Sequence, residues 1–304
     1  MTKNLFPTFL AGVAVIAAAG VVAAPARADT LIAAAPNAKN LASGGGWYAW
    51  AAPQPGGRWR LTVRNPATGL VSVPNIPDFG SAPEPAIGSA LVGSDFSQRK
   101  LVVAYSRCAG ASTTSGCDVW ALDIAAGTES RVAGLSSRTY SETEPSTYLG
   151  TWSFVRRGNV SSSKKGVFVR TRGGTRRLSP TLARETSVSG SGSRVAYAYN
   201  SSKGGGVALR RASGEGDVVT LTSQRDEIPH SLNTTRYRAS WLEGTTAWQT
   251  TRFGGSGEPH SPPLVAQLRA LPATTDGIVM DDSAVIAYMD TAGVTSISPP
   301  LFPN

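Results

Sequence analysis

Short runs of β-branched and aromatic residues recur along this chain at nearly constant spacing, and this repeat is the strongest constraint on its fold. The first residues of successive runs are separated by 53, 51, 42, 44 and 46 positions. The six runs are Trp47–Ala51, Lys100–Tyr105, Thr151–Val155, Ser193–Tyr199, Tyr237–Leu242 and Ser283–Met289. Gly, Ser, Thr and Pro interrupt every stretch longer than about ten residues, so no amphipathic helix is predicted. A period of about 40–50 residues built only from strands and turns is typical of β-propeller blades, whereas a β-sandwich gives no reason for six such copies.

The repeat therefore predicts an all-β chain that folds as a six-bladed β-propeller, each blade being a four-stranded antiparallel sheet. Six units of about 46 residues account for residues 29–304, so we expect a single domain there. The first, fifth and sixth units repeat only loosely, which leaves seven blades as an alternative. The ring has to close, because an open ring exposes two unpaired strand edges. The sixth unit supplies three strands, through Val294–Ile297, and the N-terminal segment Thr30–Ala35 is predicted to add the fourth.

The second half of each unit repeats as well. The run Thr151–Val155 is followed by Gly166–Arg170 and then by Gly173–Ser179, which reads GGTRRLS. The corresponding strands of two other units are Val119–Asp123 and Val207–Arg210. This order resembles the TolB-type propeller repeat, in which strands similar to IAF and IYVMD are followed by a GG turn and an RRLT strand, although the SPDG turn of that family is absent. The resemblance implies a TolB-like (WD40-like) propeller without the additional α/β domain of TolB, and therefore without TolB's role in the cell envelope.

The first 28 residues have the three parts of a secretory signal peptide. Lys3 provides a positive start, Phe9–Ala24 is apolar, and Ala26-Arg27-Ala28 places small residues on either side of an arginine before a cleavage site. A transmembrane anchor needs about 20 apolar residues, more than this run contains. We expect a secreted or periplasmic, monomeric protein of bacterial origin, with no membrane anchor after cleavage. The formal charge of +9 falls to +7 when Lys3 and Arg27 are removed.

Export places the two cysteines in an oxidising environment, where they are expected to pair. Cys108 and Cys117 are nine positions apart and flank a turn-rich insert between two predicted strands. A redox-active pair would favour a CxxC motif at the start of a helix, which is absent here. We therefore predict a structural disulfide that closes a hairpin.

The sequence lacks the common catalytic and metal-binding motifs. Its two histidines, His230 and His260, do not form an HExxH or other paired zinc spacing. There is no GxSxG motif and no regular DxDxDG calcium loop, and an SxxK match at Ser161–Lys164 has no SDN or KTG companion. The motifs alone therefore predict no catalytic residues and no cofactor.

Four glutamates fall at comparable positions, a few residues ahead of the innermost strand of a unit. They are Glu84, Glu144, Glu185 and Glu227, and His230 lies close to the last of them. Because the innermost strands of a propeller surround its central channel, these side chains are predicted to form a ring at one channel mouth. Such a ring suits a basic ligand or a divalent cation. Alternatively, each glutamate has a structural role and accepts hydrogen bonds from backbone groups between blades.

The basic residues are concentrated in one part of the chain. From Arg156 to Arg211 there are thirteen Lys and Arg residues and one acid, Glu185, so this segment carries +12 and the rest of residues 29–304 carries −5. Period-two geometry places Arg170 and Arg172 on one face of a strand, near an edge or a mouth. The candidate binding residues are Arg170, Arg172, Arg176, Arg177, Arg210 and Arg211. This distribution favours an unknown protein or an anionic envelope polymer as partner, with an ordinary solvated surface as the alternative. Export argues against nucleic acid.

Two functions follow from these observations. The first is a secreted, non-catalytic propeller that binds a ligand or partner at a channel mouth or at the basic flank of the third and fourth blades. The second is a propeller enzyme, a lyase or hydrolase acting on an acidic polysaccharide, in which Glu144, Glu185, Glu227 and His230 would carry the chemistry. The fold alone does not choose between them.

Overall fold

The computed structural model describes residues 29–92, 98–109, 116–137, 139–157, 164–179, 184–202, 204–215, 218–225, 227–235, 238–250, 265–280 and 286–297. The predicted signal segment, residues 1–28, and His260 lie outside the described residues. Within the described part of the chain, no helix is long and apolar enough to cross a membrane.

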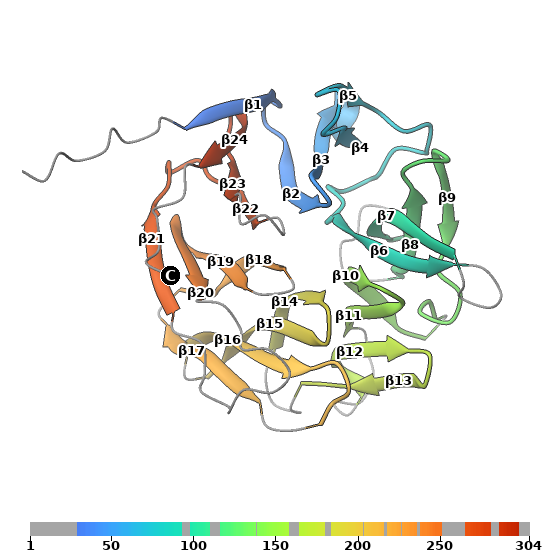
Figure 1. Cartoon of the computed structure of the whole chain (residues 1–304), viewed down its shortest axis with the longest axis vertical. Helices are drawn as coiled ribbons and strands as arrows, with labels where there is room; N and C mark the ends of the chain where they lie inside the picture. Colours follow the sequence, from blue (N-terminus) through green and yellow to red (C-terminus); the bar gives the residue numbers. More distant parts are fainter. Residues whose placement is uncertain are drawn as a thin grey trace, which may run out of the picture.

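Six four-stranded antiparallel sheets surround a central axis and form a closed ring (Figure 1). In five of these blades the strands follow one another along the chain from the axis to the rim. The first blade contains β2 (Lys39–Gly44), β3 (Trp47–Gln54), β4 (Arg58–Arg64) and β5 (Val71–Ser72), and the second contains β6 (Ala86–Val92), β7 (Gln98–Arg107), β8 (Asp118–Asp123) and β9 (Thr128–Arg131). The third blade contains β10 (Ser141–Tyr148), β11 (Thr151–Arg157), β12 (Gly166–Thr171) and β13 (Gly174–Arg177), and the fourth contains β14 (Arg184–Ser191), β15 (Arg194–Ser201), β16 (Gly204–Arg211) and β17 (Val219–Arg225). The fifth blade contains β18 (His230–Thr234), β19 (Ala239–Glu243), β20 (Thr246–Thr250) and β21 (Val265–Ala270). A single 3-10 turn, η1 (Pro55–Gly57), connects β3 to β4. The six-bladed propeller predicted from the repeat is confirmed.

The sixth blade closes the ring with strands from both ends of the described chain, as predicted. It consists of β22 (Gly277–Met280), β23 (Ile286–Met289) and β24 (Gly293–Ile297), with β1 (Thr30–Ala34) as its outermost strand. β1 is antiparallel to β24, and Leu31 lies opposite Thr295 in the register. Ala33 is buried in the apolar cluster between the sixth and first blades, and Asp29 forms an ion pair with Arg269 of β21.

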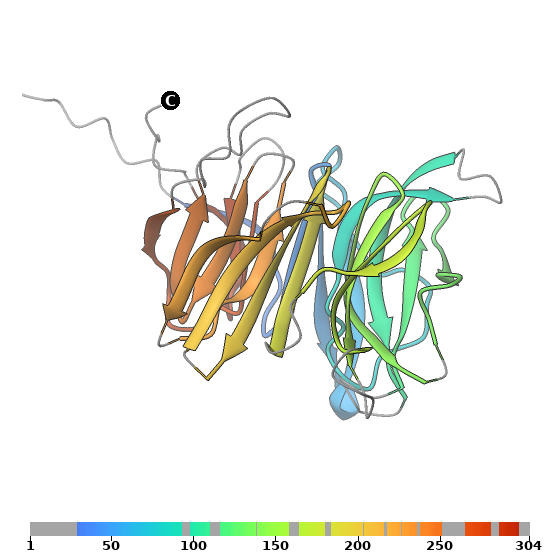
Figure 2. The same ribbon diagram turned by 90° about the horizontal axis from the view of Figure 1, so that it is seen from below.

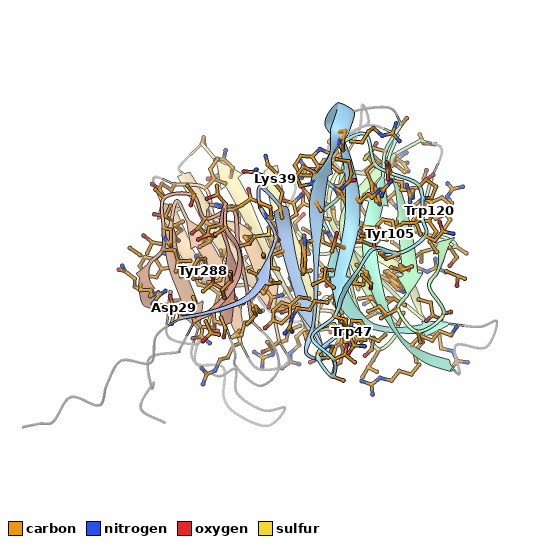
Figure 3. All side chains as sticks on the ribbon, turned by 90° about the horizontal axis from the view of Figure 1, so that it is seen from above. Asp29, Lys39, Trp47, Tyr105, Trp120 and Tyr288 are labelled. Carbon is orange, nitrogen blue, oxygen red and sulfur yellow. A yellow bond between two sulfur atoms is a disulfide. The ribbon has the colours of Figure 1, made fainter. Side chains whose placement is uncertain are left out.

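The recurring hydrophobic runs of the sequence are the second strands of the blades. Each of these strands contributes at least one large aromatic side chain that is buried between blades; one from each strand is Trp50, Tyr105, Phe154, Tyr197, Trp241 and Tyr288. Six apolar clusters result, each composed of residues from two neighbouring blades. Figure 3 shows Tyr105 and Tyr288 on separate sides of the ring. The core of this protein therefore lies between the sheets, and burial of apolar surface there is the main force that holds the blades together.

The innermost strands carry small residues because neighbouring blades approach one another closely at the axis. A Cβ atom added to Gly88 in β6 would lie 1.8 Å from the carbonyl oxygen of Thr147 in β10. A Cβ atom on Gly44 in β2 would lie 2.6 Å from the carbonyl oxygen of Ile87 in β6. Both distances are well inside van der Waals contact, so only glycine fits at these two positions.

Hydrogen bonds join neighbouring blades near the axis at every seam of the ring. Inner strands of different blades do not pair as a sheet, so short side chains supply most of these bonds. Three serines accept from backbone nitrogens of the next blade: Ser146 Oγ from Gly190 N (2.9 Å), Ser189 Oγ from Thr234 N (3.0 Å) and Ser231 Oγ from Ile278 N (2.8 Å). The other three seams are joined by Asn40 Nδ2 donating to Pro83 O (2.9 Å), Asn40 N donating to Asp276 Oδ2 (2.9 Å) and Leu149 N donating to Ser89 O (2.6 Å).

The predicted disulfide is present. Cys108 and Cys117 are bonded to each other and join the end of β7 to the start of β8. Cys117 is fully buried, and its carbonyl oxygen accepts a hydrogen bond from Glu142 N in β10 (3.0 Å). The hairpin is therefore attached to the inner strand of the next blade.

Closure by β1 is testable with two substitutions in that strand. Ala33→Asp places a carboxylate in the apolar cluster between the first and sixth blades, and we expect it to lower the free energy of unfolding by about 3 kcal/mol or more. Leu31 is 55% exposed in the same strand, so Leu31→Asp should change stability by less than about 0.5 kcal/mol. Thermal and denaturant unfolding measure both variants. Equal stability of the two would show that β1 does not close the ring.

The close approach of the inner strands predicts a second pair of outcomes. Gly88→Ala forces the Thr147 carbonyl and β10 to move, and we expect a loss of about 2 kcal/mol or more. Gly173→Ala is the matched control, because its Cβ atom would be 3.7 Å from the nearest atom, Thr171 Oγ1. The control should be neutral or slightly stabilising. Denaturant unfolding measures both, and a neutral Gly88→Ala variant would contradict the packing described above.

Candidate functional site

A cavity of about 300 Å³ lies on the propeller axis and is lined by residues from all six inner strands and from the segments just before β6 and β22. All six inner strands begin on the same face of the ring, which is also the face of η1 (Figure 2). Figure 3 marks the two ends of the channel: Lys39 at the start of β2 and Trp47 at the start of the antiparallel β3. We call the polar opening at the strand starts the channel mouth and define it by Asn40, Glu84, Glu144, His230 and Asp276, all of which line the cavity.

Glu144 lies at a bulge in β10, where the pairing with β11 shifts between Thr143 and Ser146. Its φ of +51° is in the left-handed region, and the next residue is Pro145, which further restricts its backbone. A non-glycine residue in such a conformation costs on the order of 1–3 kcal/mol and persists only where the surroundings enforce it. The strain places the Glu144 side chain at the channel mouth.

The two oxygens of the Glu144 carboxyl group have different surroundings. Oε1 pairs with the guanidinium of Arg157, the last residue of β11, and Arg157 Nε also donates to Thr143 Oγ1 (3.1 Å). Oε2 is buried and has no hydrogen-bond partner among the described residues, and the side chain as a whole is only 10% exposed. A buried acceptor without a donor is costly, so this oxygen is an unused hydrogen-bond acceptor beside the cavity.

Glu84 places a second carboxyl group beside the first. It lies two residues before β6, is exposed and lines the cavity; no described residue donates a hydrogen bond to it. Desolvation by the surrounding protein atoms raises the pKa of Glu84, and the nearby charge of Arg157 offsets part of the rise. Burial and the charge of Glu84 raise the pKa of Glu144 well above its usual value, against the lowering effect of Arg157. The two carboxyl groups therefore interact as like charges when both are ionised.

Comparison with other blades shows that Glu144 departs from a structural pattern. Asn40 in β2 and Ser231 in β18 also occupy bulges with positive φ, 58° and 51°, near the start of an inner strand. Both use their side chains to bond to a neighbouring blade. Glu144 bonds within its own blade, and the seam to the next blade is joined by Ser146 instead. Glu144 therefore has no role in joining blades.

Two mouth residues, Asp276 and Asn40, were not predicted from the sequence. Asp276 immediately precedes β22, and its Oδ2 accepts a hydrogen bond from Asn40 N (2.9 Å). The signal for Asp276 was its place ahead of an inner strand, the same place that identified Glu84. β22 itself has only four residues, which is why that signal was missed.

The predicted ring of four glutamates is only partly correct. Glu84 and Glu144 line the cavity together with His230, whose Nδ1 is 3.4 Å from Ile228 O. Glu227 lies three residues ahead of β18 as predicted, but its carboxyl group is against the Gly244 turn and does not line the cavity. Glu185 is the second residue of β14, and its side chain is outside the described part of the structure.

No metal cluster supports the cation prediction in the described residues. Among them, no group of three or more His, Cys, Asp or Glu side chains is placed to hold a metal ion. Arg157, a permanent positive charge paired with Glu144, also disfavours a metal at that carboxyl group.

Three of the six candidate arginines are attached to backbone carbonyl oxygens. Arg170 donates to Ala133 O, Arg176 donates to Ser213 O of the fourth blade, and Arg210 donates to Leu178 O of the third blade (2.5 Å). Arg177 lies against Gly166. Arg170, Arg176 and Arg210 therefore hold the third blade to its neighbours, whereas the contact of Arg177 lies within that blade.

The placement of Arg172 and Arg211 differs from that of the other arginines. Arg172 follows the end of β12 and lies in the turn to β13, so the prediction that it shares a strand face with Arg170 is wrong. Arg211 ends β16 opposite Arg194 of β15. The side chains of Arg172 and Arg211 are exposed, and no hydrogen bond or ion pair joins either side chain to another described residue. Only these two of the six are therefore free for a partner among the residues that the structure describes.

Comparison with known proteins supports the fold and does not identify a family. No protein-family model matches the sequence, and no curated protein sequence is significantly similar to it. An α-L-arabinofuranosidase from Fusarium graminearum in complex with an iminosugar inhibitor superposes with a TM-score of 0.59 at 10% identity, over 90% of this chain and 98% of that one. An α-L-arabinanase from Penicillium chrysogenum complexed with arabinobiose gives 0.57 at 11% identity, over 89% and 97%.

TolB from Acinetobacter baumannii matches with a TM-score of 0.45 at 15% identity, over 88% of this chain. This chain spans 55% of the length of that TolB protein. At these identities each similarity concerns the fold alone. The observed fold is the six-bladed propeller that the TolB-type repeat implied.

The carboxyl pair predicts a pH-dependent effect on stability. The folded protein raises the pKa of Glu84 and of Glu144. The contribution of each carboxyl group to the free energy of unfolding is therefore fully present below about pH 4 and is lost as the pH rises through the raised pKa values. Glu84→Gln removes one charge of the pair, so we expect it to match the wild type at about pH 3.5 and to be more stable than the wild type at about pH 7.

Denaturant unfolding at the two pH values measures this difference. Glu227→Gln is the matched control, because that carboxyl group is on the same face and outside the cavity. It should show no pH-dependent gain. A Glu84→Gln protein that is less stable than the wild type at neutral pH would contradict the assignment of Glu84 to an unfavourable like-charge pair.

Proposed function

We propose that this protein is an exported, non-catalytic binding propeller whose ligand enters the channel mouth and is held by Glu84 and Glu144. The observation that carries this proposal is the buried, unpartnered Oε2 of Glu144, a residue in a strained backbone conformation whose side chain makes no bond between blades. A group of this kind is unfavourable for folding, and unfavourable arrangements of this type are concentrated at functional sites. The signal peptide predicted for residues 1–28 supports export.

The mouth is a better candidate than the basic flank. Arg170, Arg176 and Arg210 already donate to carbonyl oxygens of turns, so part of their hydrogen-bonding capacity is used within the protein. Glu84 and one oxygen of Glu144 have unused acceptor capacity in a concave site. Concave sites with a few converging polar groups are the usual binding sites of small ligands.

The alternative function is a hydrolase or lyase acting on an acidic polysaccharide. The observation that favours it is the pair of carboxyl groups with raised pKa values, since glycoside hydrolysis commonly uses one carboxylic acid and one carboxylate. Two proteins of similar fold are an arabinofuranosidase and an arabinanase by name. In this version Glu144 keeps the catalytic role predicted from the sequence, and Glu84 takes the place of Glu227, which lies away from the cavity.

A ligand panel tests the proposal and separates it from the alternative. Thermal shift against neutral oligosaccharides, acidic oligosaccharides, organic cations and organic anions should show stabilisation by at least one class in the wild type. The shift should be lost in Glu84→Gln and retained in Glu227→Gln. If no class binds, or if Glu84→Gln binds as well as the wild type, the mouth is not the site. Mass spectrometry of polysaccharides incubated with the protein detects cleavage, and products lost in Glu144→Gln would establish the enzyme.

A further inference from the structure

The groups at the channel mouth leave an excess of negative charge. Glu84, Glu144 and Asp276 are carboxyl groups that line the cavity, and Arg157 is the guanidinium paired with Glu144. Asp276 receives one hydrogen bond from the backbone of Asn40. His230 is the remaining titratable side chain that lines the cavity among the described residues. With the carboxyl groups ionised, the single guanidinium does not balance the charge, and Glu84 and Glu144 repel each other.

The chemistry of the open positions points to a donor that carries positive charge. A neutral hydroxyl group can donate one hydrogen bond to Glu144 Oε2, but it does not relieve the repulsion between Glu84 and Glu144. An ammonium or guanidinium group donates several hydrogen bonds and also neutralises charge, and such charge-assisted bonds are about twice as strong as neutral ones. Because no group of three or more ligating side chains among the described residues is placed to hold a metal ion, an organic cation fits these observations best.

The size of the cavity limits the ligand. A volume of about 300 Å³ is at the lower end of the range of small-molecule pockets, roughly 300–1,000 Å³. Such a volume holds one narrow group and excludes a folded chain or a polymer strand. The cavity is lined farther from the mouth by serine, threonine and aliphatic residues, which suit a methylene chain better than a second charge.

We infer that the channel mouth binds one primary ammonium or guanidinium group on a short aliphatic chain, through hydrogen bonds to Glu144 Oε2 and the Glu84 carboxylate. This inference rests on the proposed function, because it names the ligand class of the same site. The group can belong to a free amine or to a lysine or arginine side chain, since both present the same chemistry to the mouth.

Binding of a cation by these carboxylates should depend on pH in a defined direction. The raised pKa values mean that Glu84 and Glu144 become protonated at a higher pH than an ordinary glutamate. Affinity for a cation should therefore fall as the pH is lowered through that range. Asp276 and His230 also line the cavity and Arg157 pairs with Glu144, so Glu84→Gln is needed to isolate the contribution of the carboxyl pair.

Calorimetric titration with small probes tests the inference. n-Butylammonium and n-butylguanidinium should bind, whereas butanol, which lacks the charge, and tetramethylammonium, which lacks N–H donors, should bind at least about tenfold more weakly. Glu84→Gln should weaken butylammonium binding by about tenfold or more, and Glu227→Gln should not change it. Glu144→Gln should have the same effect as Glu84→Gln; Glu84→Gln alone suffices if loss of the Arg157 ion pair destabilises the Glu144 variant.

Further probes identify the source of the cation and separate the two proposals. N-acetyl-lysine methylamide binds as well as butylammonium if the natural cation is a peptide side chain, and binds at least about tenfold more weakly if it is a free amine. Equal binding of tetramethylammonium and butylammonium would overturn the inference. The inference would also be overturned if only neutral oligosaccharides bound and their binding depended on Glu84, although the proposed function would then stand. Absence of any Glu84-dependent binding would overturn both.

Discussion

Crowding at the axis is the constraint on which the rest of this structure depends. Six strands converge around one channel, and at Gly88 the backbone of β10 is so close that no side chain fits. Large side chains are therefore displaced outward, and each blade buries an aromatic residue on its second strand, between the sheets. The same crowding brings the polar backbones of neighbouring blades together, so the inner strands need short side chains such as Ser146 and Ser231 to satisfy them. The position of the hydrophobic core between the blades and the polar lining of the channel both follow from the limited space at the axis.

The candidate site can be understood as an exception to that arrangement. Near the start of an inner strand, a bulge turns a side chain toward the neighbouring blade, as at Asn40 and Ser231. At the equivalent bulge in β10 the residue is Glu144, which is too large and too highly charged for that structural role and bonds instead to Arg157. Because the seam is already joined by Ser146, the strain at Glu144 contributes nothing to closing the ring. Strain without a structural benefit is best explained by a ligand that uses the carboxylate.

The fold was more predictable from the sequence than the site, and the same crowding explains why. Second and third strands have β-branched and aromatic residues with a clear period, so the blades and the closing strand Thr30–Ala35 could be predicted, one residue longer than β1. Inner strands such as β18, with the sequence HSLNT, consist of small and polar residues and have no hydrophobic signal. Residues placed relative to them were therefore misassigned: Glu144 lies inside β10 rather than ahead of it, Glu227 points elsewhere, and Asp276 was missed. The bulges depend on contacts between blades and have no local sequence signature.

The sequence shows an excess of positive charge in residues 156–211, and the structure shows that several of these basic side chains bond to other groups of the protein. Arg156 pairs with the buried carboxylate of Glu142 (3.1 Å) and stacks on Phe168, with 4.5 Å between the guanidinium carbon and the ring centre. Arg157, Arg170, Arg176 and Arg210 bond to other protein groups. Five of the thirteen basic side chains therefore serve contacts within the third blade or between that blade and its neighbours, and the excess charge does not by itself indicate an anionic partner. The positive charge that remains on these two blades still repels a polycation, while the mouth attracts positive charge at the axis alone. A ligand with a single cationic group can place that group in the acidic mouth without bringing further positive charge near the two basic blades, whereas an extended basic polymer cannot.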